Sequence, residues 1–167
     1  MPVPKDQNEL AELFRELGAQ DPDGWATSQM SEGINQLHRF LFLRQAWRRV
    51  VSESDDAWID QEIASAKEHP GQPFAGIGHA LAKMQAKGVA REDIVDLARG
   101  MQARLLFDFC YLLDDPSISE SSVDDLGWAL VETDDDFEPT GETISGLHES
   151  VLKTDPTGRE MRPRNAP

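Results

Sequence analysis

Residues 91–113 read REDIVDLARGMQARLLFDFCYLL, and this stretch decides the fold class. Its apolar residues recur at the three- and four-residue spacing of an α-helix, which predicts one long helix. The residues that keep this spacing are Ile94, Leu97, Met101, Leu105, Phe109 and Leu112. The run Asp114-Asp115-Pro116 ends the helix, because a residue before proline disfavours helical backbone.

The sequence before residue 91 predicts further helices by the same kind of signal. Apolar spacing predicts helices over residues 6–17, 21–51, 54–69 and about 77–88, with a loop at 71–78. The second of these begins at Asp21-Pro22, a capping residue followed by a proline that suits the first helical position. Gly33 is a weak point inside it, where we expect a kink.

The sequence after residue 116 is less regular. Residues 121–131 are expected to form a last packed helix, and a short strand near 128–132 is the alternative. From Thr133 the chain is rich in Asp, Glu, Pro, Gly and Thr, which predicts a tail with one short helical turn over 147–152. We therefore predict an all-α fold, a compact bundle of five to six helices with an acidic, partly irregular C-terminal tail. Residues 1–132 would form the helical domain. Residues 133–167 would be an acidic, then basic extension, either packed on it or mobile.

The charge of the chain is unevenly distributed. The net charge is −15, with 31 acidic and 16 basic residues, which disfavours direct binding of nucleic acid or of an anionic membrane. Thirteen of the acidic residues, and no lysine or arginine, lie between Leu105 and Leu152. Basic residues return between Lys153 and Arg164 and also gather earlier, at Arg39, Arg44, Arg48 and Arg49.

Two interpretations of this acidic segment compete. In one, it folds onto the basic residues of the same chain or faces water, as charge runs commonly do. In the other, it forms a negative surface that steers a basic partner onto the protein. The partner-binding residues that the second interpretation predicts are Asp114, Asp115, Asp124, Asp125, Asp134, Asp135, Asp136, Glu138 and Glu142.

The sequence places the protein in the cytoplasm. Its one cysteine, Cys110, excludes an internal disulfide, which fits a reducing compartment. The first residues, MPVPKDQNEL, lack the basic and apolar regions of a signal peptide. The longest apolar run, Phe109 to Leu113, is too short to span a membrane.

Motifs for catalysis, metals and cofactors fail on inspection. An EF-hand loop counted from Asp134 would need glycine and glutamate where Pro139 and Ser145 stand. The glycines at 76 and 78 lack a preceding strand and a third glycine, so a dinucleotide site is not predicted. The four histidines, His38, His69, His79 and His148, lack zinc-site spacing. We predict no catalytic residue, no metal ligand and no cofactor.

Two residues of the long helix have alternative roles. Cys110 lies in an apolar run, where burial makes a thiol inert, so a core position is favoured over a nucleophile. Asp108 interrupts the same run. It pairs with an arginine such as Arg104, acts as a catalytic acid with a perturbed pKa, or faces water.

These observations favour a binding protein over an enzyme. In its acidic composition the chain is similar to bacterial immunity proteins and phage-encoded inhibitors, a similarity that rests on no particular residue. It implies an inhibitor that engages a basic protein, such as a nuclease or another nucleic-acid-binding protein. The alternatives are a helical enzyme with a carboxylate-based site and a homo-oligomeric structural or assembly subunit, and the sequence leaves the oligomeric state open.

Overall fold

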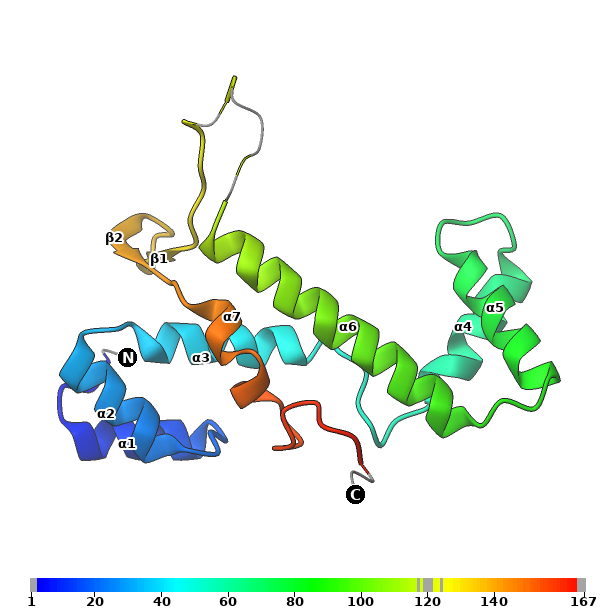
Figure 1. The fold of residues 1–167 in the computed structure, drawn as a ribbon, viewed down its shortest axis with the longest axis horizontal. Coiled ribbons are helices and arrows are strands. Elements are labelled where there is room, and N and C mark those ends of the chain that lie inside the picture. Colours follow the sequence, from blue (N-terminus) through cyan, green and yellow to red (C-terminus); the bar gives the residue numbers. More distant parts are fainter. Residues whose placement is uncertain (1–2, 117, 119–121, 124, 165–167) are drawn as a thin grey trace. The chain divides into compact units, whose positions relative to one another are not determined.

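A computed structural model describes residues 3–116, 118, 122–123 and 125–164 (Figure 1). Helices dominate, and the strands of the described residues form one two-stranded sheet, so the predicted all-α class is confirmed. The chain divides by its contacts into two units. The first holds residues 1–49 and 105–167, and the second holds residues 50–104. The boundary expected at residue 132 rests on composition and stays a prediction.

The first unit begins with three helices around an aromatic core. They are α1 (Gln7–Glu16), α2 (Pro22–Glu32) and α3 (Gln36–Trp47). Asp6 caps α1 by accepting hydrogen bonds from the backbone of Asn8 and Glu9. One aromatic ring from each helix meets at the centre, where the ring centroids of Phe14, Trp25 and Phe40 lie 5.5–5.9 Å apart.

The single long helix predicted over residues 21–51 is wrong, because two helices occupy that stretch. Gly33 ends α2 with φ +68°, a left-handed conformation that reverses the chain direction at little cost only for glycine. Helix α3 then begins at Gln36. The helical spacing continues across the break because both helices present apolar residues to the same core. Gly33 therefore marks the end of a helix and not a kink within one.

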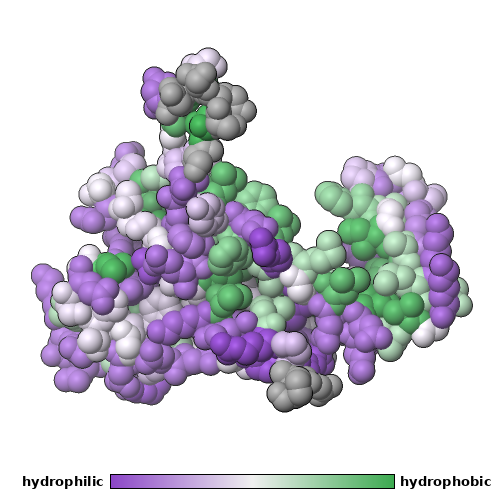
Figure 2. Space-filling model, in the orientation of Figure 1, coloured by the Kyte–Doolittle hydropathy of each residue, from purple (hydrophilic) through white to green (hydrophobic). Residues whose placement is uncertain are grey.

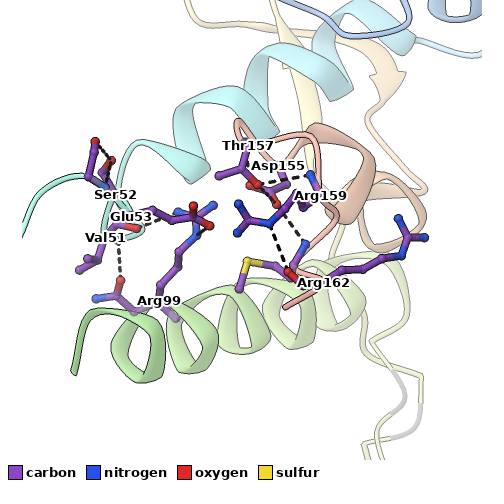
Figure 3. Close-up of polar contacts among 11 residues, drawn as sticks. Val51, Ser52, Glu53, Arg99, Asp155, Thr157, Arg159 and Arg162 are labelled. Atoms are coloured by element: carbon purple, nitrogen blue, oxygen red, sulfur yellow. Dashed lines mark hydrogen bonds and ion pairs between the residues drawn. The ribbon is translucent and has the colours of Figure 1, made fainter. Parts of the chain in front are cut away.

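The second unit is built on a close helix pair. Helices α4 (Ala57–Glu68) and α5 (Ala75–Ala86) pack together, and a Cβ at Gly78 would lie 2.1 Å from the Glu62 carbonyl oxygen. Gly78 is thus needed for this approach and not for turning the chain. In the same unit, Arg99 donates a hydrogen bond to the Val51 carbonyl oxygen at 2.7 Å (Figure 3).

Helix α6 (Arg91–Asp114) matches the predicted long helix closely, but its main buried face differs. Of the residues that define the predicted apolar stripe, only Ile94 is buried, and five are exposed: Leu97, Met101, Leu105, Phe109 and Leu112. The buried residues lie largely on the opposite side of the helix: Val95, Arg99, Ala103 and Cys110. Because these buried residues include an arginine, an alanine and a cysteine, the spacing of the large apolar side chains did not identify this face.

The helix predicted over residues 121–131 is absent from the described part of that range, which lies outside any helix up to Leu130. Instead, β1 (Val131–Thr133) pairs antiparallel with β2 (Pro139–Thr143), and Val131 lies opposite Thr143. The alternative of a short strand near 128–132 was the better one. Trp128 lies before β1 and donates a hydrogen bond to the Leu112 carbonyl oxygen at 2.7 Å.

The C-terminal segment returns to the core of the first unit. The short helix α7 (Leu147–Ser150) and the 3-10 turn η1 (Leu152–Thr154) fulfil the expected helical turn. Leu147 and Val151 are completely buried there. The Trp47 indole N–H donates to the Val151 carbonyl oxygen at 2.9 Å, which fixes the segment against α3. No helix in the described ranges is both long and apolar enough to cross a membrane.

Candidate functional site

Five of the predicted partner-binding residues lie on the β1–β2 hairpin, at its tip and on β2. They are Asp134, Asp135, Asp136, Glu138 and Glu142. The Asp134 carboxylate organises the tip by accepting hydrogen bonds from the backbone N–H groups of Asp136 (2.9 Å) and Glu138 (3.0 Å). The other acidic side chains are therefore held on a defined turn. In Figure 2 the surface around this hairpin is largely hydrophilic.

The tip of the hairpin also presents an aromatic ring. Phe137 is 85% exposed and has φ +63°, a conformation that disfavours a phenylalanine. It stands between Asp136 and Glu138, and its backbone N–H donates to the Asp134 carbonyl oxygen at 3.1 Å. Aromatic side chains are enriched at protein–protein interfaces, so the exposed ring is a candidate anchor, and the carboxylates beside it add negative charge. Sequence reasoning missed Phe137, because an isolated aromatic residue carries no signal of its exposure.

The carboxylates of the tip make no ion pair within the described residues. Asp135, Asp136, Glu138 and Glu142 are all exposed, and none lies within salt-bridge distance of a described cation. The chain from Leu105 to Leu152 contains no lysine or arginine that could neutralise them locally. Their negative potential consequently extends into solvent over about a Debye length, close to 8 Å at physiological salt.

The base of the hairpin is attached to the start of α3. The Glu132 carboxylate of β1 accepts a hydrogen bond from the Asn35 side chain at 2.6 Å and lies 3.6 Å from the His38 ring. The His38 ring in turn contacts the Asn35 side-chain oxygen at 2.5 Å. Glu132 thus anchors the base of the hairpin and Asp134 organises its tip, whereas the side chains of Asp135, Asp136, Glu138 and Glu142 are exposed.

Asp114 lies apart from the hairpin and is buried. Its side chain is 7% exposed and accepts hydrogen bonds from the His148 backbone N–H (3.0 Å) and the His148 ring (2.6 Å). It therefore caps α7 from the end of α6. Asp115 and Asp125 are exposed between α6 and β1, and Asp124 lies outside the described residues.

One interpretation of the acidic segment was that it folds onto basic residues of the same chain. Arg39 is a basic residue for which this is partly so. Its guanidinium is buried, donates to the Ser150 hydroxyl at 3.4 Å and packs against Gly146. Burial lowers the pKa of Arg39, and the nearby carboxylates of Glu149 and Asp114 oppose that shift. The acidic segment is consequently used in two ways, with Asp114 and Glu149 near a buried cation and the hairpin facing solvent.

The remaining candidate residues have structural explanations. Cys110 is buried as predicted, and burial together with the nearby Asp114 carboxylate raises the pKa of its thiol to about 12. Asp108 is exposed, so it is not a buried catalytic acid. No three histidine, cysteine or carboxylate side chains come together as metal ligands in the portion of the chain that is described.

Comparison of the chain with protein-family models, with curated proteins and with solved structures finds no match.

Proposed function

We propose that this protein binds a basic protein partner through the tip of its β1–β2 hairpin. The observation that carries the proposal is the combination of an exposed aromatic ring, Phe137, with neighbouring carboxylates that form no ion pair with any described cation. A basic partner would neutralise these carboxylates and cover the ring. Electrostatic complementarity would raise the rate of encounter, and burial of the ring would slow dissociation.

The architecture of the hairpin supports this function. Asp134 and the attachment of Glu132 to Asn35 hold the tip before any partner arrives, so less conformational entropy is lost on binding. The side chains of the tip contribute little to the stability of the fold, because they are exposed. A partner whose surface normally contacts nucleic acid suits these carboxylates, since its lysines and arginines are arranged to contact phosphates. An inhibitor of such a protein is the function favoured here.

The test is affinity capture from the protein's own cells at low and at high salt, with two charge-matched variants. The hairpin variant neutralises four carboxylates and keeps Asp134, which organises the turn: Asp135→Asn, Asp136→Asn, Glu138→Gln and Glu142→Gln. The control variant neutralises four exposed carboxylates on helices: Glu9→Gln, Glu16→Gln, Glu92→Gln and Asp93→Asn.

The proposal expects wild type and the control variant to retain the same basic protein at low salt. The hairpin variant would lose it, and high salt would weaken retention by wild type and by the control variant. Equal retention by the hairpin and control variants would refute the assignment, because the two proteins carry the same net charge and differ only in where the carboxylates were removed.

Self-association is a second candidate function, favoured by one observation. Leu105, Phe109 and Leu112 are exposed on one side of α6 within the first unit, and Figure 2 shows hydrophobic residues over this part of the helix. Such a stripe is a known way for helices to pair. Sedimentation velocity of wild type and Phe109→Glu tests it, with a dimer that the substitution dissociates as the expected result. A wild-type monomer at micromolar concentration would refute it.

A further inference from the structure

The first unit contains a pocket of about 320 Å³ between the end of α1, helix α3 and the segment after α7, and no residue of the hairpin lines it. Its apolar lining includes Leu17 and Phe40. Its charged lining includes three cations, Arg44, Arg48 and Lys153. A concentration of positive charge in one concave site is unexpected in a chain whose net charge is −15. The volume falls in the range of sites for small ligands.

The three cations differ in their hydrogen-bond and ion-pair partners. Lys153 is paired, because its ammonium lies 3.1 Å from the Asp21 carboxylate and above the Trp25 ring. Arg48 donates only to the neutral side chain of Gln45, at 3.2 Å. Arg44 is half-buried, and within the described chain it has no hydrogen-bonded or ionic side-chain partner. Arg44, in the last turn of α3, and Arg48, the residue that follows the helix, therefore lack a counter-charge in the described structure.

The wall opposite α3 is rigid. The Trp47 indole N–H donates to the Thr154 hydroxyl at 3.1 Å, and the Gln20 side chain donates to the Asp155 carbonyl oxygen at 3.2 Å. The Asp155 carboxylate is buried and accepts hydrogen bonds from the Thr157 hydroxyl at 2.7 Å and the Met161 backbone at 3.0 Å. Figure 3 shows this carboxylate at the centre of its own loop. Asp155 is thus engaged in shaping the wall.

We propose that this pocket binds a small phosphate monoester with an apolar body. Two guanidinium groups present planar sets of donors that match a doubly charged phosphate, and neither has a carboxylate partner among the described residues that would have to be displaced first. The apolar part of the ligand would lie against Leu17 and Phe40. Because the rest of the chain repels anions, a saturable anion site here requires these local cations. The site is independent of the proposed hairpin function.

Titration of the full-length protein with phenyl phosphate, followed by calorimetry and by NMR shifts, tests the proposal. Inorganic phosphate and benzyl alcohol serve as partial ligands. We expect saturable binding of phenyl phosphate, and weaker binding of inorganic phosphate, which lacks the ring, and of benzyl alcohol, which lacks the charge. Absence of saturable binding, or equal affinity for phenyl phosphate and inorganic phosphate, would overturn the assignment.

Single substitutions locate the site. Arg44→Gln and Arg48→Gln should each weaken phenyl phosphate binding about tenfold or more, because each removes a charge-assisted hydrogen bond. Arg49→Gln is the matched control, since Arg49 is exposed at the end of the same helix and does not line the pocket. Arg48 is also exposed, so its variant keeps the test valid if Arg44→Gln fails to fold. Equal weakening by Arg49→Gln would contradict the proposal.

Discussion

At the scale of the residue, Phe137 departs furthest from what folding alone requires. Its ring is 85% exposed, and its positive φ costs about 1 kcal/mol relative to a residue such as glycine. Phe74 provides a useful comparison, because it is 80% exposed with φ +70° but is the N-cap residue of α5 in the second unit, with no acidic neighbour in the sequence between Pro70 and Val89. The two residues share exposure and conformation and differ in their surroundings.

Replacing Phe137 with alanine should weaken partner binding about 30-fold, the effect of losing an interface anchor. The thermal midpoint of the free protein should stay nearly unchanged, because the ring buries little surface in it. Phe74→Ala is the control and should leave partner binding as it is. Affinity measured on the captured partner and thermal unfolding of the free variants give the two readouts. A loss of affinity shared by both variants would count against Phe137 as the anchor.

Cys110 makes a prediction about pH and reactivity. The pKa of its thiol is raised to about 12, so at pH 8 the protonated form dominates and the reactive thiolate is scarce. Compared with an unfolded chain, whose cysteine has a pKa near 8.5, native protein should react with a disulfide reagent about three orders of magnitude more slowly. Stopped-flow absorbance in buffer and in denaturant measures both rates. Equal rates would show that the thiol is accessible and ordinary.

At the scale of the element, Asp114 joins two helices that are 34 residues apart. Its carboxylate accepts from the backbone and the ring of His148, so it caps α7 from the end of α6. Asp114→Ala should lower the free energy of unfolding by about 2 kcal/mol, because two part-buried donors of His148 lose their acceptor. Asp135→Ala is the control and should change it by less than about 0.5 kcal/mol, since the Asp135 side chain is exposed. Urea unfolding compares them, and equal effects would contradict the capping role.

The two glycines of α2 and α6 should respond to alanine with opposite signs. Gly33 has φ +68° and ends α2, so Gly33→Ala should cost about 1 kcal/mol of stability. Gly100 lies inside α6, and a Cβ there would meet no atom within 4 Å. Gly100→Ala should therefore stabilise the protein by about 0.5–1 kcal/mol. Urea unfolding measures both changes, and a Gly33→Ala variant as stable as wild type would mean that the Gly33 conformation is not required.

Elements with strong local signals were predictable from the sequence. The starts and ends of α1, α4 and α6 follow from capping residues, prolines and apolar spacing. The hairpin was not predictable from the sequence, because β2 is exposed along its whole length and lacks the alternation of apolar and polar residues that marks a half-buried strand. In the candidate site, the acidic character of the hairpin could be predicted from the sequence, but the burial of the Asp114 side chain could not. That burial depends on α7, which approaches only in the folded chain.

At the scale of the whole molecule, the net charge of −15 affects folding and binding in opposite directions. Raising the salt from about 0.01 M to about 0.1 M shortens the Debye length from about 30 Å to about 10 Å. Screening should relieve self-repulsion and raise the free energy of unfolding in urea. The same change should weaken the complex with a basic partner. If the free energy of unfolding falls with added salt, as the affinity for the partner does, repulsion among the acidic residues does not dominate the electrostatic contribution to stability.

Photo-cross-linking in the protein's own cells tests the central claim most directly. A photoreactive phenylalanine analogue is placed at position 137 in one protein and at position 74 in another, and the cross-linked products are identified. The account predicts that position 137 captures one basic protein and that position 74 does not. Capture of that protein in equal yield at both positions, or no specific product at position 137, would contradict a partner-binding role for the acidic hairpin.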